Sequence, residues 1–111
     1  MNDSIYIDMK KIDLSQYGTH TDELYPLVSI IIPCYNDGEY LLEALESALS
    51  QTYPSIEVII VDDASRDPTT ISILESISHP RINIYHNTEN MHLSGTRNRG
   101  ISLSNGKYIT Y

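Results

Sequence analysis

Two apolar runs constrain the fold of this chain more than any other feature. Residues 27–32 read Leu-Val-Ser-Ile-Ile-Ile, and residues 56–61 read Ile-Glu-Val-Ile-Ile-Val. Short runs rich in β-branched residues are typical of strands that are buried on both faces, as in parallel sheets. We expect the first strand to stop at Pro33, because proline lacks the N–H group that a sheet ladder uses.

Helical spacing follows each of these strands. Apolar residues recur at i, i+3, i+4, i+7 and i+8 from Leu41 to Leu49, which predicts an amphipathic helix of about 12 residues. Asp67-Pro68 then has the pattern of an N-cap followed by proline at the first helical position. We expect this second helix to bury a stripe made of Ile71, Leu74 and Ile77.

The remaining elements repeat the alternation. We predict a third strand at 81–86, a loop at 87–91, a helix at 94–104 with Asn105-Gly106 as its C-terminal cap, and a fourth strand at 107–111. The order predicts an α/β fold: a Rossmann-like open, mainly parallel sheet with helices on both faces. Residues 1–25 have no sustained period, so we expect a leader or arm before a domain spanning 26–111.

Composition excludes several classes of partner and site. The 111 residues fit one small domain, and a net charge of −8 argues against a nucleic-acid partner. A single cysteine, Cys34, permits no internal disulfide, and we interpret it as a small, semi-buried residue rather than a nucleophile. No apolar run approaches the roughly 20 residues of a bilayer span. We therefore expect a cytoplasmic protein, with membrane association of a longer parent left open.

Ligands of open α/β sheets bind beyond the carboxyl ends of the strands. Tyr35, which follows Pro33 at the first strand's end, offers a flat face for a nucleobase. Asp62 and Asp63 end the second strand and point to opposite sides, so one of them can face a ligand while the other caps backbone amides. After the third strand, Arg97 could bridge a diphosphate, whereas Arg99 is equally well explained as part of a solvated basic face.

An ordered series of motifs identifies a family. The chain carries PCYN at 33–36, SALSQTYP at 47–54, VDDAS at 61–65, NTEN at 87–90, RNRG at 97–100 and GKYI at 106–109. Each motif is weak alone, but the ordered series closely resembles the N-terminal half of family-2 glycosyltransferases over residues 26–111. The resemblance implies a GT-A fold and a nucleotide-diphosphate-sugar donor, with nucleotide-binding roles for Pro33, Tyr35, Asp62, Asp63, Asn90 and Arg97.

The resemblance also implies parts that these 111 residues lack. In the family, the strand that matches residues 107–111 runs into an acidic Asp-x-Asp motif, which holds a divalent cation, Mn²⁺ or Mg²⁺, on the diphosphate. We therefore expect no catalytic residue and no metal in this chain, and no sugar transfer by it alone. His92 stands where the family commonly has glycine, so we expect the loop after Asn90 to take a different path.

Rival interpretations stay open to different degrees. A phosphorylated receiver domain would need an aspartate after a later strand, where this chain has Asn87. A nucleotidyltransferase would need a glycine-rich loop where residues 33–37 read PCYND. A non-catalytic nucleotide-binding or interaction module of the same fold, which kept the fold and lost the chemistry, is the alternative that stays open for these 111 residues. We also expect self-association through an exposed sheet edge or apolar face, as a homodimer. The acceptor glycan, lipid or protein is not specified.

Overall fold

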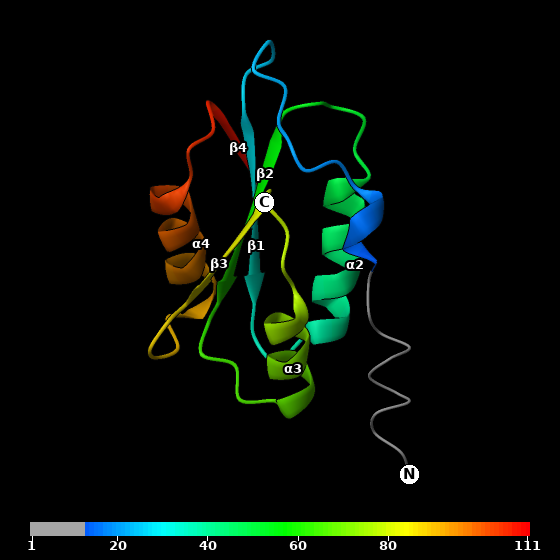
Figure 1. Cartoon of the computed structure of the whole chain (residues 1–111). Coiled ribbons are helices and arrows are strands. Elements are labelled where there is room, and N and C mark those ends of the chain that lie inside the picture. The colour runs from blue at the N-terminus through cyan, green and yellow to red at the C-terminus, as the bar shows by residue number, and fades with distance from the viewer. Residues whose placement is uncertain (1–12) are drawn as a thin grey trace.

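The computed structural model describes residues 13–111, so the first twelve residues of the predicted leader lie outside the described residues. Residues 13–111 form a sheet of four strands with three α-helices and one short 3₁₀ turn, arranged as Figure 1 shows. In chain order the elements are η1 (Leu14–Gln16), β1 (Val28–Cys34), α2 (Gly38–Leu49), β2 (Ile56–Asp62), α3 (Pro68–Ser76), β3 (Ile82–His86), α4 (His92–Leu103) and β4 (Tyr108–Thr110).

The sheet is parallel throughout, with the strand order β3-β2-β1-β4. Along β1 and β2 the register runs from Val28 opposite Ile56 to Cys34 opposite Asp62. Since all four strands run in the same direction, their carboxyl ends lie at one edge of the sheet. The predicted open parallel sheet is confirmed.

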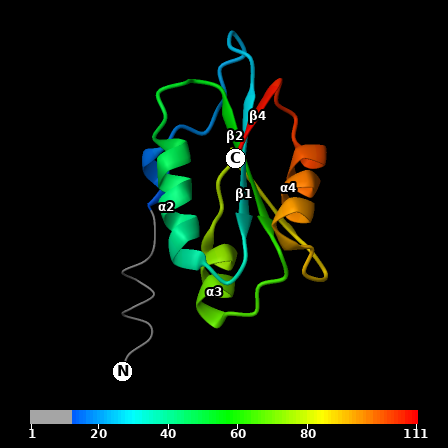
Figure 2. The same ribbon diagram turned by 180° about the vertical axis from the view of Figure 1, so that it is seen from behind.

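Helices cover both faces of this sheet. α2 and α3 lie on one side and α4 on the other, as the two opposite views show (Figures 1 and 2). Val58 and Ile60 of β2 belong to the core beneath α2 and α3, while Ile59 and Val61 belong to the core on the other face. Every residue of β2 is buried, which is the physical reason for its nearly unbroken apolar sequence.

The prediction that β1 stops at Pro33 is wrong. The strand continues to Cys34, and Pro33 lies opposite Val61 in the parallel register. β4 pairs only with Val28–Ile30, so no described strand needs an N–H group from Pro33 on that side of β1. Proline is tolerated at such edge positions.

Two details of the helices also differ from prediction. Of the predicted stripe, Leu74 and Ile77 are buried, with Ile77 directly after the last residue of α3, but Ile71 is only partly buried, and Thr70 and Ile73 complete the buried side of the helix. α4 begins at His92, two residues before the predicted start. The N-cap of α3 is confirmed, because the Asp67 carboxylate accepts a hydrogen bond from the Thr70 N–H at 3.0 Å.

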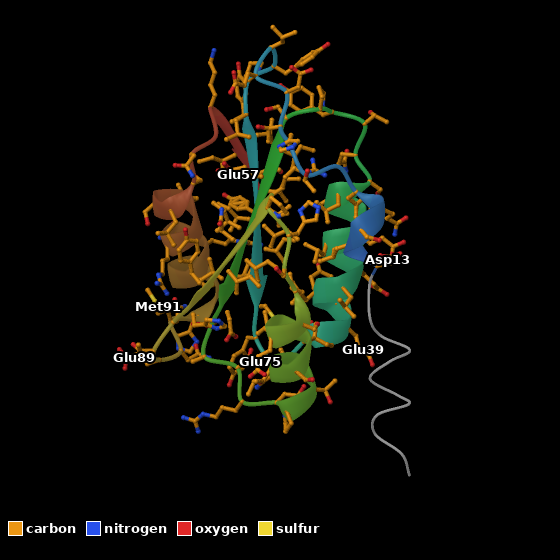
Figure 3. The ribbon with its side chains drawn as sticks, viewed as in Figure 1. Asp13, Glu39, Glu57, Glu75, Glu89 and Met91 are labelled. Atoms are coloured by element: carbon orange, nitrogen blue, oxygen red, sulfur yellow. The ribbon has the colours of Figure 1, made fainter. Side chains whose placement is uncertain are left out.

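Asn105 and Gly106 do not cap α4. The helix ends at Leu103, and no described glycine has a positive φ. The buried Glu57 carboxylate accepts the Asn105 N–H at 2.7 Å, and the Ser29 hydroxyl accepts the Gly106 N–H at 2.8 Å. These residues therefore fasten the connection between α4 and β4 to the amino ends of the central strands, at the end of the sheet opposite Glu89 and Met91 (Figure 3).

The described part of the predicted leader packs on the domain. Leu14 and Tyr17 contact the core beneath α2 and α3, and the Asp22 N–H donates to the Pro54 carbonyl at 3.2 Å. The Tyr53 hydroxyl donates to the Pro26 carbonyl at 2.6 Å. A domain boundary at residue 25 stays a prediction. None of the helices within residues 13–111 has the length and apolar character of a bilayer span.

Candidate functional site at the carboxyl edge of the sheet

A pocket of about 490 Å³ opens where β1, β2 and the start of α4 meet. It lies beyond the carboxyl ends of the strands, where open α/β sheets bind ligands. Its walls come from three separate segments of the chain, and most of its lining is apolar. The lining residues are Pro33, Cys34, Tyr35, Asp63, Asn90, His92, Leu93 and Thr96.

Asp63 forms the polar part of this pocket and is only 4% exposed. Its Oδ1 accepts hydrogen bonds from Asn87 Nδ2 at 2.8 Å and from the Met91 N–H at 2.6 Å. Burial raises the pKa of the Asp63 carboxyl, but these hydrogen bonds outweigh it and hold the pKa below its ordinary value. The side chain is thus an ionised anchor for the start of α4.

The anchor extends through Asn87, the residue that follows β3. Asn87 Nδ2 also lies 3.2 Å from Thr96 Oγ1, and Asn87 Oδ1 accepts a hydrogen bond from Arg99 Nη1 at 2.5 Å. The interpretation of Arg99 as part of a solvated basic face is therefore wrong. Arg99 points back toward the sheet because Asn87 provides an acceptor there.

Asp62 faces the opposite side of β2. Its Oδ1 accepts the Ser65 N–H at 3.0 Å, and its Oδ2 lies 2.9 Å from His86 Nδ1. It lines a second, more polar pocket of about 460 Å³. The two adjacent aspartates thus enter different pockets, as the alternation of side chains along a strand requires.

Tyr35 and Asn90 line both pockets, so the two hollows adjoin. The Tyr35 ring is 49% exposed and is available for stacking against a planar ligand. Asn90 has a local role as well, because its Oδ1 accepts the His92 N–H at 2.9 Å.

Cys34 contributes an apolar wall to the first pocket. The residue is 3% exposed, and burial, aided by the nearby carboxylates of Asp62 and Asp37, raises the pKa of its thiol to about 11. A thiol with such a pKa is protonated at neutral pH and is a poor nucleophile. The structure agrees with the interpretation of Cys34 as a packing residue.

Unusual backbone conformations gather at this edge of the sheet. Asn36, Ala64 and His92 are the described non-glycine residues with positive φ, at 52°, 62° and 62°. They lie after β1, after β2 and at the start of α4. Positive φ is costly for residues with a Cβ atom, and such strain clusters at ligand sites.

The structure brings together some of the predicted site residues and separates others. Pro33, Tyr35, Asp63 and Asn90 line one pocket, and Asp62 lines its neighbour. Arg97 lines neither. Its guanidinium carbon lies 4.8 Å from the centre of the Tyr111 ring, and its Nε is buried without a hydrogen-bond partner among the described residues. A contact between Arg97 and a diphosphate stays a prediction.

Sequence reasoning missed three of the pocket's walls. Leu93 and Thr96 lie on the first turns of α4, and His92 precedes them. The only available signal was their position directly after a predicted ligand loop. The predicted helix start at residue 94 leaves His92 and Leu93 outside the helix, so the prediction gives no orientation for these two side chains.

Residues 13–111 contain no group of three or more His, Cys, Asp and Glu side chains that could hold a metal ion. Asp62 and Asp63, the adjacent pair, are directed to different partners: one toward Ser65 and His86, the other toward Asn87 and Met91. The described residues therefore do not fit a divalent cation, and no step of a reaction is assigned to one here.

A parallel sheet with helices on both faces and a pocket beyond its carboxyl ends defines the class of open α/β proteins. A family model described as Glycosyl transferase family 2 matches residues 29–111. The chain belongs to this family, and its fold is part of a GT-A fold.

Curated relatives carry the same assignment. An uncharacterized glycosyltransferase of Rickettsia bellii is 44% identical over 87 residues, covering 78% of this chain and 12% of the relative. GlyG of Streptococcus pneumoniae is 39% identical over 85 residues, with coverages of 76% and 28%. WfaP of Escherichia coli, a UDP-Glc:alpha-D-GlcNAc-diphosphoundecaprenol beta-1,3-glucosyltransferase, is 42% identical over 85 residues, with 77% and 34%. The chain thus spans between an eighth and a third of these relatives.

Solved structures share the fold. The mannosyltransferase PcManGT of Pyrobaculum calidifontis, in complex with GDP-Man and Mn²⁺, superimposes with a TM-score of 0.64 at 24% identity, covering 96% of this chain and 33% of its own. TarS of Staphylococcus aureus in complex with UDP-GlcNAc gives a TM-score of 0.64 at 27% identity, covering 75% and 25%.

Proposed function

We propose that this chain supplies the nucleotide-sugar-binding part of an enzyme that transfers a sugar, from a UDP-linked donor, to an acceptor in glycan synthesis. The observation that carries the proposal is the pocket of about 490 Å³, whose lining includes Pro33, Tyr35, Asp63 and Asn90. Pro33 lies at the end of β1, and the other three lie in the loops that follow β1, β2 and β3. These four residues are also four of the six that the family motifs mark for nucleotide binding.

The chemistry of the lining suits a nucleobase. Tyr35 offers an exposed ring for stacking, and Pro33 and Leu93 add apolar walls. The hydrogen bonds from Asn87 and Met91 both use Oδ1 of Asp63, while a carboxylate accepts about four in all. The Thr96 side chain and the His92 N–H also act as hydrogen-bond donors to this carboxylate, so we propose that an N–H of the base competes with these donors for Asp63.

A divalent cation belongs to the proposal for the whole enzyme only. The PcManGT structure holds Mn²⁺ with GDP-Man, and such an ion neutralises charge on a leaving diphosphate. Since residues 13–111 offer no fitting cluster, we propose that its ligands lie elsewhere in the protein. Nucleotide affinity of the 111-residue chain should then be the same with and without manganese.

The test of the pocket uses two exposed tyrosines. Tyr35→Ala removes the ring that lines the pocket, and Tyr40→Ala removes a ring of α2 that is 58% exposed and lines neither hollow. We expect Tyr35→Ala to weaken binding of UDP-GlcNAc by about tenfold, since a stacked base is worth about 1–3 kcal/mol. Tyr40→Ala should bind like the wild type. Equal affinities of all three proteins, measured by calorimetry, would exclude this pocket as the base site.

The alternative is a non-catalytic nucleotide-binding or interaction module of the same fold. It predicts the same binding to residues 1–111, so binding alone cannot separate the two. A parent gene that encodes an acidic Asp-x-Asp motif after residue 111 supports the transferase. A parent without such a motif favours the binding module.

Self-association and a cytoplasmic location are further parts of the proposal. β4 exposes Tyr108 at 56% and Ile109 at 41%, and Tyr111 beyond it is 64% exposed. Exposed apolar edges favour pairing with a second copy, so we expect a homodimer. Light scattering that shows a monomer at high concentration would contradict it. The location is proposed from the single cysteine alone.

A further inference from the structure

His92 has a backbone conformation that needs an explanation. Its φ is 62°, in the left-handed region that residues with a Cβ atom adopt at a cost. Two hydrogen bonds fix the chain around it: the His92 N–H donates to Asn90 Oδ1 at 2.9 Å, and the preceding Met91 N–H donates to Asp63 Oδ1 at 2.6 Å. These two hydrogen bonds thus keep the backbone of His92 in its positive-φ conformation.

The side chain that this conformation presents lines the candidate pocket. It is exposed, and no hydrogen bond to its imidazole is formed within residues 13–111. The imidazole ring is therefore neither buried nor hydrogen-bonded within residues 13–111. Residues with strained backbones occur where the surrounding structure fixes their conformation, and they cluster at ligand sites. The strain at His92 therefore suggests that its side chain contacts a ligand.

Charge decides what the imidazole can contribute. His92 is the only lining residue of this pocket that can carry a positive charge, because the lining contains no lysine or arginine. The titratable groups near it are Cys34 at the end of β1, Tyr35 after β1 and Asp63 after β2, which line the same pocket, and Glu89 on its own loop, which lines the adjoining pocket. A dianionic ligand in this pocket meets the Asp63 carboxylate, and His92 is the one side chain of the lining able to offset the charges, whereas Glu89 and Arg66 line the adjoining pocket.

We propose that His92 contacts the diphosphate of the bound nucleotide sugar and, when protonated, pairs with it. This inference rests on the proposed function, because it requires a nucleotide in this pocket. Histidine changes charge between about pH 5 and 8, and a protonated imidazole donates from both nitrogens to phosphate oxygens. His92 is thus a binding residue that makes donor affinity depend on pH.

The experiment measures binding of UDP-GlcNAc and of uridine to the 111-residue protein by calorimetry, at about pH 5.5 and about pH 8. The diphosphate of a nucleotide sugar is a diester and keeps its charge throughout this range. His92→Asn removes the imidazole but keeps a residue type that tolerates positive φ. His20→Asn, at an exposed position that lines neither pocket, is the matched control.

We expect the wild type and His20→Asn to bind UDP-GlcNAc between about two- and fivefold more tightly at the lower pH, the scale of an exposed ion pair. Uridine affinity should not change, and His92→Asn should lose the dependence. Unchanged pH dependence in His92→Asn overturns the inference while leaving the proposed function intact. Equal weakening of uridine and UDP-GlcNAc in His92→Asn also overturns it, in favour of a contact with the base. If the wild type binds no nucleotide, the proposed function itself is wrong.

Discussion

The Asp63 carboxylate and the Met91 N–H are joined by a hydrogen bond of 2.6 Å, although the two residues are 28 positions apart in the sequence. This bond connects the end of β2 to the residue before α4. Asp63 therefore stabilises the fold and also lines the pocket where a nucleotide is proposed to bind. Substitution of Asp63 must therefore be judged on stability before it is judged on binding.

Asp63→Asn should destabilise the fold by about 2 kcal/mol, because hydrogen bonds to a charged group are worth about 1.5–3 kcal/mol. The loss of charge weakens the bonds from Met91 and Asn87. Urea denaturation measures the effect. Asp37→Asn is the matched control, since the Asp37 side chain caps no backbone group of α2. Equal stability of both variants would show that the Asp63 contacts contribute little.

Acidification should remove the same contribution. The folded-state pKa of Asp63 lies below its ordinary value of 3.8, so its ionised form stabilises the fold above that pH. The stabilisation is lost as pH falls from about 3.8 through the folded pKa. Denaturation midpoints between pH 5 and pH 2 should therefore fall less steeply in Asp63→Asn than in the wild type. If the midpoints of the wild type and of Asp63→Asn fall equally steeply with pH, the ionised Asp63 carboxylate does not stabilise the fold.

His92→Gly should stabilise the chain by about 1 kcal/mol. Glycine adopts positive φ freely, whereas the left-handed conformation costs other residues roughly 1–2 kcal/mol. Conversely, His92→Val should destabilise it, because a β-branched residue is least compatible with this backbone. Thermal denaturation of His92→Gly, His92→Val and the wild type measures these effects. A lower melting temperature for His92→Gly than for His92→Val would show that the His92 backbone is not strained.

Gly100→Ala should be destabilising by about 1–3 kcal/mol through overpacking. A Cβ at Gly100 would lie 2.5 Å from Cγ2 of Ile31, a side chain that is 1% exposed. α4 would have to move away from the sheet and from the pocket that its first turn lines. Gly18→Ala, where no atom lies within 4 Å of the added Cβ, is the control and should leave the denaturation midpoint unchanged.

Cys34 should resist alkylation in the folded chain. Its thiol pKa of about 11 leaves almost no thiolate near pH 8, and the side chain is buried. Iodoacetamide labelling followed by mass spectrometry should be slow in buffer and fast in denaturant. Rapid labelling without denaturant would show that the pocket wall opens readily.

The strands and helices were predictable because their signals are local. The apolar runs of β1 and β2 mark buried strands by composition, and the spacing from Leu41 to Leu49 marks α2 as an amphipathic helix. The prediction for Pro33 failed for a different reason. Whether proline ends a strand depends on which neighbour needs its missing N–H, and that neighbour lies far away in the sequence.

The candidate site was predictable as a set of loops but not as a set of contacts. The rule that ligands bind at the carboxyl ends of parallel strands pointed to Tyr35, Asp63 and Asn90, and the structure places all three around one pocket. The roles of Arg97 and Arg99 could not be foreseen. Arg97 and Arg99 lie two positions apart on α4 and therefore point to different sides of the helix. The rotation of α4 about its axis, relative to the sheet, decides which guanidinium reaches Asn87.

The sequence by itself determined the order of elements, the burial of the central strands and the family, because these depend on residue patterns within short windows. Only the tertiary structure decided that Arg99 donates to Asn87, that Glu57 binds the backbone of Asn105, and that His92 takes positive φ. Each of these depends on groups distant in the sequence that meet only when the sheet has formed. The physical reason is that hydrogen bonds and close packing act over a few ångströms in space, whatever the separation along the chain.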